Sequence, residues 1–166
     1  MDCSLDDARL TLAGLFFEAH AGLAATLERR LEAECGLTNQ WFEVLLRLAR
    51  SPEERLRMSD LTAQVALTPS GLTRVVDRLE AAGLVTREAC PTDRRGYNAV
   101  LTKEGKARIE HAVPIHLSHL DEVFTGVLDE KERVQFERSL RKVRDRLFPC
   151  ATAGASGVSE SATRPR

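Results

Sequence analysis

Apolar residues recur every three or four positions along most of this chain, which is the spacing of amphipathic helices. The first helix is expected to begin in the acidic stretch at residues 4–7, because carboxylates suit the positive end of a helix dipole, and to end near Gly36. A second helix should follow Thr38 and end before Ser51, and Ser59 should open a third, short one. The predicted inward side of the first helix consists of Leu12, Leu15, Phe16, Ala19, Leu23, Leu27 and Leu31.

The stretch LTPSGLTRVVDRLEAAGLV, residues 67–85, predicts the best-defined helix of the chain. Thr68 can cap its N-terminus, and Pro69 fits the first helical position, where the missing amide would be unpaired anyway. Gly83 suits the left-handed residue that ends a helix. The link to the short helix at 60–66 is so brief that the two should form a helix-turn-helix pair. The apolar residues Leu72, Val75, Val76 and Leu79 fall on one side.

A β-hairpin is predicted next. Strand-forming residues occur at 84–89 and 97–102, and the residues between them, 91–96, are turn-formers and charged residues. This hairpin would have a basic tip. The order helix, helix, hairpin is that of a winged helix-turn-helix.

Two more helices are expected after the hairpin. Thr102 should cap a long helix that runs from Lys103 to about Val127 and bends at Pro114. Asp129 and Glu132 have the spacing of a capping box for the last helix. The last helix has an apolar side formed by Phe136, Leu140, Val143 and Leu147.

These elements predict a mainly α fold with a small β-hairpin wing, organised as one domain over residues 1–148. In it, a winged helix-turn-helix lobe at about 38–102 is flanked by helices at 5–36 and 103–148. Small and polar residues predominate afterwards, so residues 149–166 are expected to form a disordered tail.

The composition leaves the kind of partner open until charges are placed along the chain. The net charge is −1 over 166 residues, of which 43% are apolar, and the pI is about 6.4. Basic residues nevertheless outnumber acidic ones over residues 68–108, whereas the first 37 residues lean acidic. Because charges interrupt the longest apolar runs, we expect no secretory signal and no membrane span, and therefore a cytoplasmic protein.

The polar side of the helix at 69–82 suits DNA. Small residues at a helix N-terminus allow a close approach, and the free amides there bind phosphate. The hydroxyls of Ser70 and Thr73 can meet base edges in the major groove. Arg74 can fork onto guanine or a phosphate, and Arg78, one turn further, can reach the flanking backbone. The alternative is a solvated helix face on which Arg78 pairs with a nearby acid.

The predicted wing tip adds to this indication. Arg94 and Arg95 would lie on a short loop, which is the arrangement needed to enter a narrow, strongly negative minor groove. Asp93 can orient one guanidinium through a bidentate pair. The hairpin therefore favours a DNA-binding function over a plain solvated helix.

LTPSGLTRVVDRLEAAGLVTR, followed by PTDRRGYNAVLTKEGKA, resembles the MarR family of multiple-antibiotic-resistance-type transcriptional regulators over roughly residues 5–148. The resemblance implies a homodimer that binds a pseudo-palindromic operator in double-stranded DNA, usually as a repressor released by a small molecule. It implies major-groove contacts by Ser70, Gly71, Thr73 and Arg74. It also implies that Arg95 is the minor-groove arginine, Asp93 its positioning acid and Arg87 a backbone contact at the base of the wing. Arg94 is commonly basic or polar in the family.

A homodimer also has a physical argument. The helices at 5–36 and 103–148 have apolar sides that need a partner, and a two-fold dimer would cover them while spacing two recognition helices about one DNA turn apart. These helices are therefore the predicted dimerisation helices. The alternative is that the first and last helices form a bundle within one chain.

An effector site is suggested by the same resemblance. In the family, effectors commonly bind where the first, second and fifth helices meet the DNA-binding lobe. The matching positions are Phe16, Phe17, His20, Trp41 and His111. Aromatic residues around an apolar cleft with one polar group suit a planar ligand, aromatic or acidic. The alternative is that these aromatics are core residues.

Two other triggers stay open as alternatives for a regulator of this fold. His116 and His119, with His111 and Asp121 nearby, could begin a zinc site, although Pro114 can interrupt the register. Our main prediction is a protein without a bound metal or cofactor.

A redox switch is the other trigger. The four cysteines are scattered without a CxxC pair and read as reduced thiols: Cys3, Cys35, Cys90 and Cys150. Of these, Cys90 lies beside the basic wing, where oxidation would disturb DNA contact.

Catalysis is not indicated. The sequence holds no P-loop, dinucleotide fingerprint, HExxH or nucleophile elbow, so we expect no enzyme and no catalytic residues. Winged helices also serve as protein-interaction modules, but the paired arginines of residues 93–95 argue against that alternative.

Overall fold

The computed structural model describes residues 5–65, 67–90 and 93–147. The predicted tail at 149–166 and the side chains of residues 93–95 lie outside this description. In chain order, the elements are α1 (Ala8–Cys35), α2 (Asn39–Ala49), a 3₁₀ turn (Pro52–Glu54), β1 (Arg55–Arg57), α3 (Met58–Gln64), α4 (Pro69–Ala81), β2 (Val85–Cys90), β3 (Asp93–Leu101), α5 (Lys103–Val123), a second 3₁₀ turn (Thr125–Val127) and α6 (Glu130–Leu147).

The helix caps expected from the sequence are confirmed at several ends. The hydroxyls of Thr38, Thr68 and Thr102 each accept a hydrogen bond from an amide in the first turn of α2, α4 and α5. Asp129 and Glu132 form the reciprocal capping box of α6, with bonds of 2.9 and 2.8 Å. These side chains fix where four helices begin.

The end of α4 has the predicted left-handed turn. Gly83 has a φ of 74°, which favours glycine. Its amide donates to the carbonyl of Glu80, and the amide of Leu84 donates to the carbonyl of Leu79, both at 2.9 Å. This is the bond pattern of a Schellman motif, and it turns the chain directly from α4 into β2.

Two helix boundaries differ from the prediction, and one strand was not predicted. α3 begins at Met58, one residue before Ser59, and the Ser59 hydroxyl contacts the Asp60 carboxylate instead of capping the helix. Strand β1 was not expected, since three residues are too short for a period to show. α5 ends at Val123, four residues early. There the chain folds back so closely that a Cβ on Gly126 would overlap the carbonyl of Asp121.

The hairpin turn is also shorter than predicted. β3 already begins at Asp93, and Cys90 pairs with Asp93 after a register shift between Ala89 and Cys90. Arg94 and Arg95 therefore lie in a strand, and the prediction of a loop at these positions is wrong. Backbone pairing with β2 outweighs the weak strand propensity of these charged residues.

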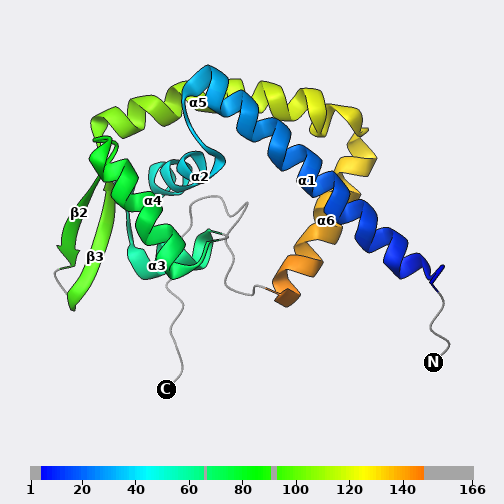
Figure 1. The fold of residues 1–166 in the computed structure, drawn as a ribbon, viewed down its shortest axis with the longest axis horizontal. Helices are drawn as coiled ribbons and strands as arrows, with labels where there is room; N and C mark the ends of the chain where they lie inside the picture. The colour runs from blue at the N-terminus through cyan, green and yellow to red at the C-terminus, as the bar shows by residue number, and fades with distance from the viewer. Residues whose placement is uncertain (1–4, 66, 91–92, 148–166) are drawn as a thin grey trace.

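The winged lobe has a compact core. Its antiparallel sheet has the strand order β1-β3-β2, of which β2 and β3 are labelled in Figure 1. The apolar sides of α2, α3 and α4 meet beside this sheet, and the start of α5 closes the core. The fully enclosed side chains include Val44, Leu45, Leu48, Leu61, Leu72, Val76, Leu79 and Val85.

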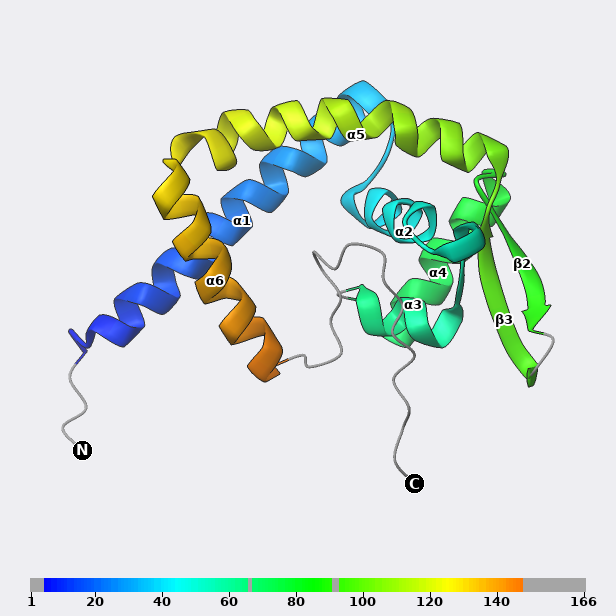
Figure 2. The ribbon, with the colours of Figure 1, turned by 180° about the vertical axis from the view of Figure 1, so that it is seen from behind.

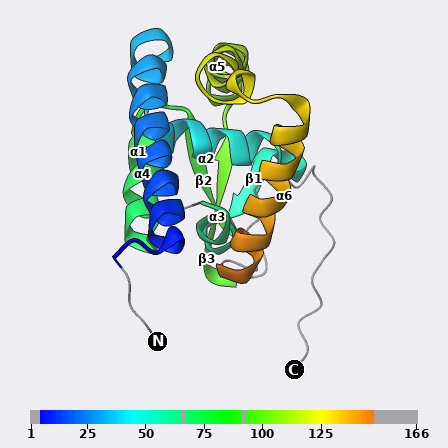
Figure 3. The same ribbon diagram turned by 90° about the vertical axis from the view of Figure 1, so that its right-hand side faces the viewer.

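The long helices extend away from this lobe. α5 runs out of the wing and carries α6 at its far end, while α1 packs along α5 (Figure 2). α1 and α5 are joined by a bidentate ion pair between Arg30 and Glu122, at 2.6 and 2.8 Å. Arg108 of α5 also donates to the carbonyl of Cys35 at 2.9 Å. Seen from the end, α1 and α6 lie on opposite sides of the molecule, with α5 at the top between them (Figure 3).

The first half of α1 is apolar and exposed, and only Leu27, Leu31 and Cys35 of this helix are buried. By length and composition alone, α1 could cross a membrane, with a mean hydropathy of 1.4 over its most apolar stretch. The premise that charges interrupt every long apolar run does not hold for α1, while the absence of a membrane span stays a prediction. The C-terminal part of α1 is nevertheless part of the protein core.

Candidate nucleic-acid interface

Helix α4 has two chemically different sides. Leu72 and Leu79 are fully enclosed in the core of the lobe, as the sequence pattern predicts. Ser70, Arg74 and Arg78 are exposed on the other side. Burial of the apolar side fixes the rotation of the helix, so these polar side chains are held outward.

Small residues at the N-terminus of α4 allow an outside group to come close to the helix backbone. The Thr68 hydroxyl accepts the amide of Gly71 at 3.1 Å and lies 3.4 Å from the Ser70 hydroxyl. A Cβ on Gly71 would come within 3.0 Å of the Thr68 hydroxyl oxygen, which is tighter than an ordinary contact. The helix therefore presents small polar groups at this end, where backbone amides favour an anion such as a phosphate.

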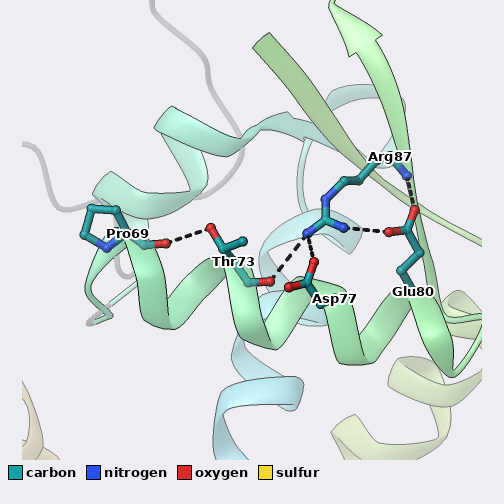
Figure 4. A network of polar contacts seen from close by, with 5 residues as sticks. All are labelled: Pro69, Thr73, Asp77, Glu80 and Arg87. Atoms are coloured by element: carbon teal, nitrogen blue, oxygen red, sulfur yellow. Dashed lines mark hydrogen bonds and ion pairs between the residues drawn. The ribbon is translucent and has the colours of Figure 1, made fainter. Parts of the chain in front are cut away.

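The Thr73 hydroxyl donates its hydrogen within α4. The hydroxyl donates to the carbonyl of Pro69 at 2.9 Å (Figure 4). Thr73 as a whole is exposed to solvent. Thr73 can therefore accept a bond from a base or contact a thymine methyl, rather than donate.

Arg74 and Arg78 are exposed cations. Among the residues that the structure describes, neither guanidinium group has an ion-pair or hydrogen-bond partner. The alternative in which Arg78 pairs with an acid is therefore absent from the described part of the chain. Both guanidinium groups are available to an outside partner.

Arg87 is held differently. It lies on β2, and its guanidinium reaches Asp77 and Glu80 of α4, each at 2.6 Å, and the carbonyl of Thr73 at 3.4 Å (Figure 4). The Glu80 carboxylate also accepts the backbone amide of Arg87 at 3.1 Å. The predicted backbone-contact residue is thus bonded to the recognition helix, and its side chain is only 22% exposed.

Strand β1 adds two arginines that the sequence analysis missed. Arg55 pairs with Glu88 of β2 at 3.2 Å, although β3 lies between the two strands. Arg57 donates to the Cys90 sulfur from two nitrogens, at 3.3 and 2.9 Å. These contacts link the two outer strands of the sheet. The three-residue sequence RLR is too short for its alternation to predict a strand.

The predicted effector residues occupy separate places in one chain. On the exposed half of α1, Phe16 contacts Phe17 edge to face and stacks with His20, with ring centroids 5.7 and 6.5 Å apart. Trp41 packs against the core of the lobe. His111 lines a depression of about 570 Å³ near the C-terminus of α1. Of the five, only Phe16 lines the groove of about 780 Å³ that lies between α1 and α6.

Two histidines of α5, His116 and His119, are packed against protein groups. His119 Nε2 lies 2.9 Å from a carboxylate oxygen of Glu34 on α1, and the His116 ring stacks on Phe42 with centroids 4.3 Å apart. Burial, and then the neighbouring His119, lower the pKa of His116. No group of three potential metal ligands occurs within residues 5–65, 67–90 and 93–147.

The described cysteines are both buried and reduced. Burial, together with the neighbouring Glu34, raises the pKa of the Cys35 thiol, which makes it a poor nucleophile. Cys90 is held by Arg57 at the end of β2. Cys3 and Cys150 lie outside the described residues.

Comparison with known proteins agrees with this geometry. The profile of the MarR family matches residues 36–96, which span the winged lobe. The chain is 32% identical over 112 residues to the HTH-type transcriptional repressor YetL of Bacillus subtilis, which covers 68% of this chain and 66% of YetL.

Two solved structures are similar over most of the chain. Sco3205 of Streptomyces coelicolor, a MarR family transcriptional regulator in complex with DNA, has 31% identity and a TM-score of 0.84, covering 90% of this chain and 93% of Sco3205. BpsR of Bordetella bronchiseptica, whose DNA binding is regulated by 6-hydroxynicotinic acid, has 27% identity and a TM-score of 0.72, covering 81% and 99%. The chain belongs to the MarR family and is a DNA-binding transcriptional regulator with a winged-helix fold.

Proposed function

We propose that this protein is a homodimeric repressor that leaves a pseudo-palindromic operator when a small molecule binds. The observation that carries the proposal is the outward face of α4, where Arg74 and Arg78 are exposed cations beside a helix N-terminus of small polar residues. A helix of this kind can enter the major groove with its amides toward the phosphates.

The proposed major-groove contacts lie in the first half of α4. Ser70, Thr73 and Arg74 would meet base edges, and Gly71 would allow the backbone to come close. Arg78, one turn further, would reach a phosphate beside the site. All these side chains lie on the side of α4 that the core leaves free.

The wing would supply the minor-groove contact. Arg95 is the proposed minor-groove residue, Asp93 its orienting acid, and Arg94 a neighbouring phosphate contact. Because this segment is a strand, the wing is a two-stranded ribbon almost to its end, which is stiffer than a loop. A stiff ribbon would bring its arginines to the groove at lower entropic cost.

The proposed dimer accounts for the long helices. Leu12, Leu15 and Phe17 of α1 are 71%, 59% and 66% exposed, and Val143 and Leu147 of α6 are 57% and 65% exposed. A groove of about 780 Å³ lies between Phe16 of α1 and the apolar side of α6, which supports a partner outside the chain rather than a bundle within it. A second copy would bury both surfaces, and it would present a second α4 to the DNA. We therefore propose residues 5–36 and 103–148 as dimerisation helices around the lobe at 38–102.

A small-molecule effector is proposed from the relatives and from the aromatic residues of α1. BpsR responds to 6-hydroxynicotinic acid, a planar acidic compound. Phe16, Phe17 and His20 form an exposed aromatic group that a partner chain would enclose. Trp41 on the lobe core and His111 in a separate depression are the other residues that we propose for the effector site. A protein with this role acts on chromosomal DNA, so we propose a cytoplasmic location.

The proposal is tested by fluorescence anisotropy with the protein's own upstream intergenic DNA at several salt concentrations. Saturable binding that resists competitor DNA, with a steep salt slope, is expected. Arg95→Ala should weaken operator binding by about 1–3 kcal/mol. Arg138→Ala on α6 is the matched control, because it removes the same charge far from α4. Equal affinity of the wild type for operator and competitor, or unchanged binding by Arg95→Ala, would contradict the proposal.

A further inference from the structure

Arg87 joins two parts of the proposed DNA-binding surface. It belongs to β2, the strand that leads into the wing, and it binds α4 over two helical turns, from Thr73 through Asp77 to Glu80 (Figure 4). Both acids lie on the helix face that looks toward β2. The contact is therefore a clasp between the recognition helix and the wing.

The clasp also involves the backbone. β2 is an outer strand of the sheet, so amides on its free side have no strand partner. The Glu80 carboxylate binds the Arg87 amide with one oxygen and the Arg87 guanidinium with the other. The Glu80 side chain of α4 therefore fixes both the backbone of β2 at Arg87 and the Arg87 guanidinium.

The charges argue against a free phosphate contact by Arg87. One guanidinium faces two carboxylates, so the cluster of Arg87, Asp77 and Glu80 has a net negative charge at neutral pH. A phosphate approaching Arg87 would also meet the two acids. Arg74 and Arg78, which lack such partners among the described residues, are better placed for that contact.

We propose that Arg87, through Asp77 and Glu80, is a positioning residue that sets the angle between α4 and the wing. The inference rests on the proposed function, because that angle matters only if helix and wing enter adjacent grooves together. Displacements of about 1 Å are enough to weaken such a constellation. The residue acts through its neighbours and needs no contact with DNA.

Two variants distinguish positioning from direct contact. Arg87→Lys keeps the charge but cannot fork among three acceptors. Positioning predicts at least a tenfold loss of operator affinity with unchanged affinity for competitor DNA, whereas a phosphate contact predicts near wild-type binding. The double variant Asp77→Asn, Glu80→Gln removes two negative charges. Positioning predicts a similar loss of operator affinity, whereas a phosphate contact predicts tighter binding.

Hydrogen exchange of the DNA-free protein tests the clasp without an operator. Arg87→Lys should speed exchange in β2 and in the second half of α4, and leave α1 and α5 as in the wild type. Arg133→Lys, which alters an ion pair within α6 and away from the sheet, is the matched control. Unchanged exchange in β2, or unchanged operator affinity in both variants, would overturn the inference. A wild type without operator preference would instead overturn the proposed function.

Discussion

In the winged lobe, the apolar sides of α2, α3 and α4 face one another, and Leu45 and Leu61 have no exposed surface. On α1 and α6, the same residue types at the same helical spacing face outward. Leu15 is 59% exposed and Leu147 is 65% exposed. The lobe is complete within one chain, whereas the long helices are covered only if something else binds them.

The difference shows what a hydrophobic period does and does not predict. A spacing of three and four residues states that one side of a helix is buried in the native assembly. It does not state whether the covering surface belongs to the same chain. Each Å² of exposed apolar surface costs roughly 25 cal/mol. Burying the exposed apolar sides of α1 and α6 against a partner therefore favours association.

The largest effect is expected from Leu45→Ala. This side chain is fully enclosed, so truncation should destabilise the protein by ~2–5 kcal/mol, measured by urea unfolding. The matched change Leu15→Ala on α1 should leave the fold of the chain intact and shift the monomer–dimer equilibrium in sedimentation. Equal unfolding losses for both variants would remove the distinction between the two regions.

Phe136→Glu should separate the copies. Phe136 lies on the apolar side of α6 and lines the groove beside α1. A buried carboxylate there would cost roughly 3 kcal/mol, or about a hundredfold in the dimer Kd. Light scattering should show monomers at concentrations where the wild type is dimeric. Arg138→Glu, two residues along and on another side of the helix, is the control, and a dimeric Phe136→Glu protein would argue against this interface.

Gly105→Ala tests how tightly α5 is joined to the lobe. A Cβ at this position would overlap the carbonyl of Leu84, in the turn after α4. Relieving the overlap should cost about 1–3 kcal/mol in thermal unfolding. Glu104→Ala, at an exposed site in the same turn, is the control. If Gly105→Ala unfolds at the wild-type temperature, α5 is not fixed to the lobe as described.

His116→Leu should give the smallest effect, on the pH dependence of stability. Burial lowers the pKa of His116 in the folded protein, so the unfolded chain binds its proton at higher pH. His116 therefore favours folding above about pH 6.5, its ordinary pKa, and this contribution is lost as the pH falls toward the folded pKa.

The measurement is urea unfolding of the wild type and His116→Leu between about pH 5 and pH 8. The leucine variant should lose less stability on acidification than the wild type does. His111→Leu, at an exposed site, is the control. Parallel curves for the wild type and His116→Leu would show that burial of His116 has no energetic consequence.

Most of the fold could be predicted from the sequence, because its signals are local. Thr68 and Gly83 define both ends of α4 through bonds to residues nearby in sequence, and both ends are confirmed. The exceptions depend on distant residues. β1 exists only because it pairs with β3, and the strand at Asp93 exists because β2 lies beside it.

The candidate site divides in the same way. The outward position of Ser70, Arg74 and Arg78 follows from the apolar period of α4, which the sequence shows directly. The bonds of Arg87 do not, because Asp77 and Glu80 come near it only once α4 and β2 are packed together. No spacing along the chain indicates that an arginine seven residues after Glu80 binds back to it.

The most direct test of the account is sedimentation velocity of the protein with a duplex that contains its operator. The account predicts two chains on each duplex, with a dimer in the absence of DNA and no single-chain complex at intermediate ratios. One chain on each duplex, at concentrations that saturate binding, would contradict it.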